Sequence, residues 1–156
     1  MTKEFSMALQ LKTSIDIDAA PEAVWAVLSD LSAYPTWNPF IREAHGELVA
    51  GERLEVTMHP EGGRAMRFRP TVLSAEPGHE LRWRGRLVAP GLFDGEHRFA
   101  IEPTTGGSRL VQEERFTGVL VPLLAKGLRT RTLPAFEQMN EALKARAEAA
   151  SARAAA

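Results

Sequence analysis

The chain contains no cysteine. This absence excludes disulfide bonds, thiolate metal sites and a cysteine nucleophile. Its histidines show no metal-ligand spacing, and no phosphate-binding loop, dinucleotide-binding glycine pattern or nucleophile elbow occurs. We therefore expect neither a bound metal nor a cofactor, and nucleotide-driven and serine-hydrolase chemistry are disfavoured.

An excess of charge and long apolar runs are also missing. The net charge is -1, whereas a nucleic-acid-binding domain normally carries a basic excess. No stretch approaches the roughly 18 apolar residues that span a bilayer. Residues 1–6 show neither a long apolar core nor a cleavage motif. We expect a soluble cytoplasmic protein with no nucleic-acid partner and no stable membrane insertion; its oligomeric state stays open.

What is present is the composition of one ordinary globular domain. Of the 156 residues, 44% are hydrophobic and 25% are charged. A chain of this length buries about 68–70% of its unfolded surface, which suffices for a core. We expect a single domain over residues 1–156 with its core at about 8–149. The alanine-rich tail at 150–156 buries little, so it should fray.

The spacing of apolar residues predicts a strand, short helices, a series of strands and a long helix. Residues 9–17 alternate as in a half-buried strand, and residues 21–31 have helical spacing. From 41 to 118 the period is mostly two, and tight turns divide it into an antiparallel meander. Pro70 suggests an edge or a bulge in the strand over residues 66–72. The last helix has an apolar stripe: Leu120, Leu124, Leu128, Phe136, Met139 and Leu143. Pro134 should kink or split it.

The segment Tyr34-Pro-Thr-Trp-Asn-Pro-Phe40 is rich in aromatic residues for a loop. Its two prolines predict a stiff loop rather than a continuous helix or an interior strand. An apolar loop must cover the core, a cavity or a partner. As a lid, Trp37 and Phe40 would supply an apolar wall and Asn38 a directional hydrogen bond. Alternatively, Trp37 fills the core and Asn38 caps the turn.

The sharpest candidate for chemistry is a histidine paired with a glutamate. A turn at residues 104–107 places His97 opposite Glu114 and Phe99 opposite Gln112. A slip by one residue would set Phe99 beside charged side chains, which disfavours other registers. The pair could be self-satisfied in the core, could orient a ligand's carbonyl or hydroxyl, or could move protons. His97 and Glu114 are therefore the candidate catalytic residues, and Gln112 extends their polar strip or bonds to the helix.

The other candidate ligand contacts are large apolar side chains on the predicted inner faces. They are Met58, Phe68, Trp83, Phe99, Phe136 and Met139, accompanied by Met66, Phe93 and Phe116. Each is individually more typical of a core residue than of a ligand contact. The small residues Gly85 and Gly95 lie between them, leave room and permit strong curvature.

Basic residues gather on the predicted outer faces of the strands and on the last helix. The strand arginines are Arg67, Arg69, Arg82, Arg84, Arg86 and Arg98, and we expect a solvated face balanced by glutamates. Lys126, Arg129 and Arg131 could meet lipid headgroups or form a solvated helix face.

The order of elements and several motifs resemble the START-like, or helix-grip, fold of the SRPBCC superfamily, including its polyketide cyclase/dehydrase-like group. The resemblance covers residue 9 to about 147. The motifs are Ala20-Pro-Glu-Ala-Val-Trp25, the segment from Tyr34 to Phe40, Leu81-Arg-Trp83, Gly95-Glu-His-Arg-Phe99, Glu114-Arg-Phe-Thr-Gly118 and Met139-Asn-Glu-Ala-Leu143. It implies an α+β helix-grip fold: a curved antiparallel sheet of about six or seven strands wrapped round a long C-terminal helix, with two short helices after the first strand.

The same resemblance implies binding of a small hydrophobic ligand in a cavity between the sheet and the C-terminal helix. A lipid, a polyketide or an aromatic metabolite would suit such a cavity. The superfamily also includes cyclase/dehydratase-type enzymes and protein-interaction modules of the chaperone-activator type. Since a fold does not determine a function, both alternatives stay open.

Overall fold

The computed structural model describes residues 8–60, 62–87 and 89–156. Two predictions concern residues outside this part: the absence of an apolar core and cleavage motif in residues 1–6, and the turn that contains Glu61. The elements in chain order are β1 (Ala8–Ile17), α1 (Pro21–Ser29), the 3-10 turn η1 (Leu31–Ala33), α2 (Tyr34–Trp37), β2 (Ile41–His45), β3 (Glu55–Met58), β4 (Met66–Phe68), β5 (Thr71–Glu76), β6 (Glu80–Leu87), β7 (Phe93–Thr104), β8 (Gly107–Thr117), α3 (Val121–Gly127), the π-helical turn η2 (Leu128–Thr132) and α4 (Leu133–Ala155).

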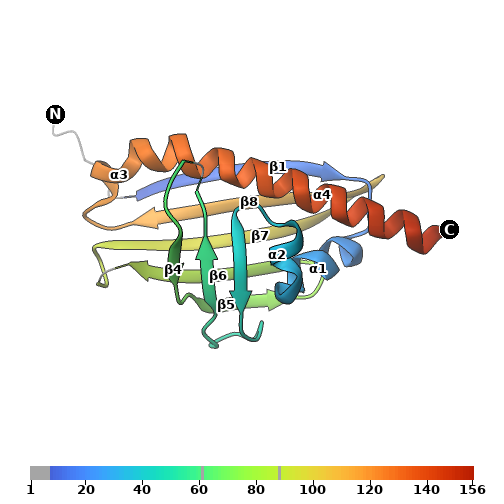
Figure 1. Cartoon of the computed structure of the whole chain (residues 1–156), viewed down its shortest axis with the longest axis horizontal. Helices are drawn as coiled ribbons and strands as arrows, with labels where there is room; N and C mark the ends of the chain where they lie inside the picture. The colour runs from blue at the N-terminus through green and yellow to red at the C-terminus, as the bar shows by residue number, and fades with distance from the viewer. Residues whose placement is uncertain (1–7, 61, 88) are drawn as a thin grey trace.

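The strands form two antiparallel sheets. The larger sheet has the order β1-β8-β7-β6-β5, and the smaller one has the order β2-β3-β4. Figure 1 shows the smaller sheet crossing in front of the larger one, with α4 along one side of both. The predicted α+β class and antiparallel pairing are confirmed. Eight strands occur within the described residues, against the six or seven expected.

The extra strand arises at Pro70. The apolar pattern predicts one strand over residues 66–72, but β4 ends at Phe68 and β5 begins at Thr71. Proline has no N–H to donate to a strand ladder, and Pro70 contributes only its carbonyl, which accepts a hydrogen bond from Leu54 N at 2.9 Å. The chain passes here from the smaller sheet to the larger one. The predicted edge or bulge is therefore a break between two sheets.

The predicted register of β7 and β8 is confirmed. His97 lies opposite Glu114, Phe99 opposite Gln112, and Gly95 opposite Phe116. Because side chains alternate along a strand, one face of this pair enters the core, and the opposite face carries charged residues. On the outer face of the larger sheet, Arg82 of β6 forms ion pairs with Glu80 of its own strand and Glu96 of β7, and Arg98 forms ion pairs with Glu80 and Glu113 of the neighbouring strands. This is expected for a solvated face.

The C-terminal helix is divided as predicted at Pro134. The π-helical turn η2 directly precedes α4, whose first turn contains this proline. Proline donates no hydrogen bond, and its ring clashes with the carbonyl four residues earlier, so the α-helical ladder is interrupted there. Helix α4 packs against β1 and α1 and buries Phe136, Met139 and Leu143. Within the described residues no helix has both the length and the apolar character needed to cross a membrane.

Two ends of this helix differ from the prediction. The structure continues α4 to Ala155, where we expected a frayed tail from residue 150, in keeping with the high helix propensity of alanine. At the other end, Leu124 of the predicted stripe is exposed rather than packed. A π turn holds more residues than an α turn. The extra residue in η2 therefore rotates the apolar face of α3 relative to that of α4, and Leu124 no longer points to the core.

Candidate functional site

A largely apolar cavity lies between the two sheets and η2. Its volume, counted as the space open to the centre of a water-sized sphere, is about 70 Å³. The lining residues are Phe40, Met58, Pro60, Met66, Phe68, Gly85, Phe93, Gly95, Glu114, Phe116, Leu128 and Thr132. A single water needs only about 10–15 Å³ by this measure, so the space suits something larger.

The floor of the cavity is formed by two opposed glycines. Gly85 of β6 lies directly opposite Gly95 of β7. A Cβ on Gly95 would lie 2.6 Å from Oε1 of Glu114, and a Cβ on Gly85 would lie 3.1 Å from the ring of Phe68. Side chains at these two positions would therefore occupy space that the cavity and the carboxyl group of Glu114 now use.

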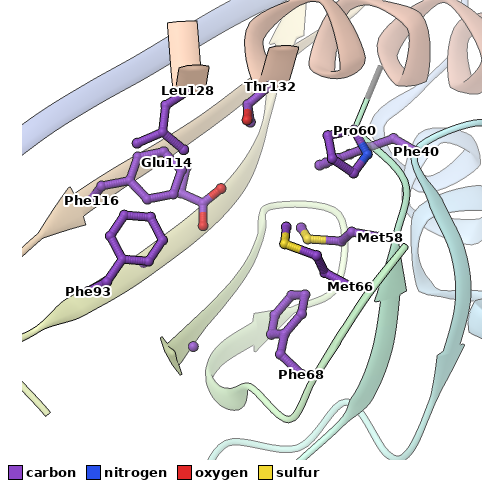
Figure 2. A pocket seen from close by; sticks show the side chains of 12 residues that line it. Phe40, Met58, Pro60, Met66, Phe68, Phe93, Glu114, Phe116, Leu128 and Thr132 are labelled. Atoms are coloured by element: carbon purple, nitrogen blue, oxygen red, sulfur yellow. The ribbon is translucent and has the colours of Figure 1, made fainter. Parts of the chain in front are cut away.

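Polar groups are scarce in the cavity. Among the described lining residues, Glu114 is the only charged one, and Thr132 supplies a hydroxyl. Figure 2 shows the carboxyl group of Glu114 pointing into the space between the Phe93–Phe116 side and the Met58–Met66 side. The side chain of Glu114 is 12% exposed. A polar group on a bound molecule would thus meet this carboxyl group or the Thr132 hydroxyl.

Behind Glu114 lies His97, which is completely buried. Its Nδ1 is 3.3 Å from Oε2 of Glu114, and its Nε2 is 3.0 Å from Nε2 of Gln112. The Gln112 amide also donates to Sδ of Met139 at 3.6 Å. With the amide nitrogen as the donor, Nε2 of His97 is the acceptor, and in the corresponding imidazole tautomer the ring proton is on Nδ1. That proton faces Glu114, although the contact is not aligned as a hydrogen bond.

Aromatic rings surround His97. Its imidazole stacks on Phe99 at 4.5 Å between centroids and contacts Phe136 at 5.0 Å and Trp83 at 5.4 Å. His97 is accordingly absent from the cavity lining. Glu114 is the side chain that joins the buried polar strip to the cavity. A proton passing between His97 and a molecule in the cavity would therefore travel through the carboxyl group of Glu114.

The predicted ligand contacts divide into two layers. Phe40, Met58, Phe68 and Glu114 line the cavity, as do the accompanying Met66, Phe93 and Phe116. Trp83, His97, Phe99, Gln112, Phe136 and Met139 are buried behind the lining. Sequence reasoning missed Pro60 and Thr132 as lining residues, and it named Leu128 only as part of the apolar stripe of the last helix. Pro60 belongs to the β3–β4 connection and Thr132 to the π turn, and strand or helix periodicity indicates neither position.

The aromatic segment is partly helical rather than a loop. Residues 34–37 form the short helix α2, with a proline in its first turn. The ring of Trp37 packs edge-on against Tyr34 at 5.2 Å. Oδ1 of Asn38 accepts hydrogen bonds from the backbone N–H of Phe40 and of the residue after it, at 3.0 and 2.9 Å. Asn38 therefore caps the turn, and Phe40 is the residue of this segment that reaches the cavity.

No group of three or more histidine, aspartate or glutamate side chains in the described ranges is placed to hold a metal ion. The polar groups at the cavity are the carboxyl group of Glu114 and the hydroxyl of Thr132, and the buried imidazole of His97 lies behind them. Such groups can accept or donate hydrogen bonds and can exchange a proton with a bound molecule.

Comparison with known proteins places this geometry in a wider group. The family described as polyketide cyclase / dehydrase and lipid transport matches residues 8–148. No match is found among curated proteins. The di-domain ARO/CYC StfQ from the steffimycin biosynthetic pathway is 17% identical with a TM-score of 0.74; the alignment covers 96% of this chain and 53% of StfQ. This chain thus spans about half the length of StfQ.

Two further solved structures have similar folds. The Zhui aromatase/cyclase from a Streptomyces species is 16% identical with a TM-score of 0.73, covering 90% of this chain and 94% of Zhui. A protein from Mesorhizobium loti is 20% identical with a TM-score of 0.66, covering 88% of this chain and 96% of that one. At these identities the likeness is one of fold, the helix-grip fold. Because the family match spans nearly the whole described fold, the chain belongs to the polyketide cyclase/dehydrase and lipid transport family of the SRPBCC superfamily.

Proposed function

We propose that the protein binds a small hydrophobic molecule with a hydroxyl group, oriented by the carboxyl group of Glu114. The observation that carries this proposal is the one charged side chain among the described residues that line an otherwise apolar cavity. An apolar wall favours burial of hydrophobic surface, and a single acceptor fixes the orientation of the ligand. Membership of a family that includes cyclases and lipid transporters supports the same class of ligand.

The wall of the cavity suits a flat ring system. Phe93 and Phe116 are stacked at 5.4 Å with an angle of 9° between their planes. Across the cavity, Met58 and Met66 offer flexible, polarisable side chains that adapt to different outlines. An aromatic metabolite or a polyketide with a phenolic hydroxyl therefore fits this site better than a purely aliphatic chain.

A pair of probes isolates the role of the carboxyl group. Binding of 2-naphthol and of naphthalene would be measured by calorimetry on the purified protein, because the two probes differ only in a hydroxyl. We expect 2-naphthol to bind at least about tenfold more tightly, since a hydrogen bond to a charged group contributes about 1.5–3 kcal/mol. In Glu114→Met, of similar size but apolar, this advantage should disappear while naphthalene binding is kept.

The control is Glu137→Met, which removes an exposed glutamate of α4 outside the cavity lining. It should leave both affinities unchanged. If neither probe binds, the proposal that the cavity binds small aromatic molecules is wrong. An unchanged preference for 2-naphthol in Glu114→Met would remove Glu114 as the orienting group.

A second candidate function is a cyclase or dehydratase reaction. The observation that favours it is that Glu114 contacts both the cavity and Nδ1 of His97. Glu114 could take a proton from a carbon next to a ligand carbonyl, with His97 stabilising the changing charge. Turnover of a polyketide-like diketone probe should then have a pH–rate profile that changes in Glu114→Gln and in His97→Gln. An identical profile in both variants would eliminate the pair as acid and base.

The interaction-module alternative predicts a closed core, and the cavity does not support it. Native mass spectrometry of gently purified protein offers a first check on all three functions. A discrete bound adduct favours ligand binding, whereas a bare mass shifts weight toward transient turnover or a closed module.

A further inference from the structure

An exposed apolar surface lies where β8 leads into α3. Leu123 is 80% exposed, Val119 is 55% exposed and Leu124 is 39% exposed, and Pro122 between them is also exposed. We call Val119, Pro122, Leu123 and Leu124 the apolar tip. Exposed leucines that occur singly need no explanation, but a contiguous group of large apolar side chains marks an interaction site.

The apolar tip is held in position by the neighbouring turn. Val119 N donates to Gly91 O at 3.2 Å, and the N–H of Leu120 donates to Leu92 O at 3.1 Å. Gly118 has φ +129°, and a Cβ there would lie within 2.3 Å of Leu92 O, so only glycine permits this close approach. On the inner side Val121 is buried in the core. The exposure of the apolar tip is thus a feature of the fold.

Positive charge follows the apolar tip along the chain. From residue 115 to residue 136 the sequence contains no aspartate or glutamate. Within this stretch Lys126, Arg129 and Arg131 are all exposed, and no ion pair joins them to another described residue. Asp94, near the start of β7, accepts a hydrogen bond from Gly91 N at 3.3 Å. On α4, by contrast, Lys144 forms an ion pair with Glu148.

We infer that the apolar tip and these three cations form a docking surface for an anionic lipid bilayer. Leucine and valine side chains at a protruding end would enter the acyl boundary, while the neighbouring ammonium and guanidinium groups would meet lipid phosphates. Charge complementarity selects this occupant.

The docking surface adjoins the cavity through η2. Leu128 and Thr132 of that turn, immediately beyond α3, line the cavity (Figure 2). Docking would bring the cavity close to the bilayer, so an apolar ligand could pass between them with little exposure to water. This consequence rests on the proposed function; the docking itself does not.

Vesicle flotation tests the inference without any ligand. The full chain would be mixed with phosphatidylcholine vesicles with and without about 30% phosphatidylglycerol, because anionic lipid attracts cations near a membrane surface. We expect flotation with the anionic vesicles only, weakened by added salt. Removing the cations as Lys126→Gln, Arg129→Gln and Arg131→Gln should weaken binding about fivefold for each charge. Leu123→Ser with Leu124→Ser should weaken it about tenfold or more.

Matched controls lie on distant surfaces. Val49→Ser changes a residue that is 54% exposed in another loop, and Arg146→Gln with Arg153→Gln removes exposed cations of α4. These variants should float as the parent does, and all variants should keep the parent's 2-naphthol affinity. Lack of flotation with anionic vesicles, or equal flotation of the tip variants, would overturn the inference. So would concentration-dependent self-association that Leu123→Ser abolishes, because a second copy would then cover the apolar tip.

Discussion

The carboxyl group of Glu114 occupies the space that a side chain on Gly95 would need. Oε1 of Glu114 lies 2.6 Å from the ideal Cβ position of Gly95, which is far closer than atoms in contact approach. On the other side Oε2 of Glu114 is 3.3 Å from the ring of His97. The direction of the carboxyl group therefore depends on the absence of a side chain two residues from His97 on the same strand.

Gly95→Ala should displace the carboxyl group of Glu114 from the cavity. We expect the preference for 2-naphthol over naphthalene to fall, with only a small loss in the free energy of unfolding, because the atom that must give way is the end of a flexible side chain. Gly85→Ala is the matched change on the facing strand, where the new Cβ meets the ring of Phe68 at 3.1 Å. It should weaken both probes alike. The same preference in both variants would contradict this account.

His97→Ala should destabilise the fold. The imidazole is completely buried among aromatic rings, and its loss leaves a cavity and a Gln112 amide without its partner. Together these effects should lower the free energy of unfolding by about 2–5 kcal/mol, measured by urea denaturation. A change below about 1 kcal/mol would show that water or a neighbouring side chain replaces the ring.

Stability should fall in acid partly through Glu148. Hydrogen bonds from Lys144 Nζ at 2.8 Å and from the backbone N–H of Asp18 at 2.9 Å lower the pKa of Glu148. The folded chain then binds this proton less readily than the unfolded chain. The contribution is complete above the ordinary glutamate pKa of about 4.3 and is lost as pH falls through the lowered pKa. Glu148→Gln should flatten the acid limb of the curve of stability against pH, and Glu137→Gln should not.

Truncation to alanine should destabilise the fold strongly at one leucine of the C-terminal helical segment and hardly at all at another. Leu143 is completely buried, so Leu143→Ala should cost about 2–5 kcal/mol of unfolding free energy. Leu123 is 80% exposed, so Leu123→Ala should stay within about 0.5 kcal/mol of the parent. Thermal or urea denaturation would measure both. A large loss at Leu123 would mean that this side chain is covered in solution.

Local patterns were sufficient for several parts of this fold. Alternation along β7 and β8, together with the turn between them, predicts that His97 lies opposite Glu114, because a slip by one residue would set Phe99 beside charged side chains. Pro134 predicts the division of the last helix, since its ring and missing N–H act on the nearest turn. The cap formed by Asn38 was likewise one of two local readings of the aromatic segment.

The sequence by itself thus determined the class of fold, the pairing of β7 with β8 and the presence of a polar strip on an inner face. Tertiary structure decided which member of that strip faces the cavity. His97 and Glu114 share one face of the larger sheet, but aromatic rings enclose the first, while the paired glycines and η2 leave space beside the second. Periodicity reports only which face a side chain occupies. Whether that face meets a neighbouring side chain or a void depends on two features: the break between β4 and β5 at Pro70, which separates the two sheets, and the π-helical turn η2 in the C-terminal helix. Both act through contacts between segments that are distant in the sequence.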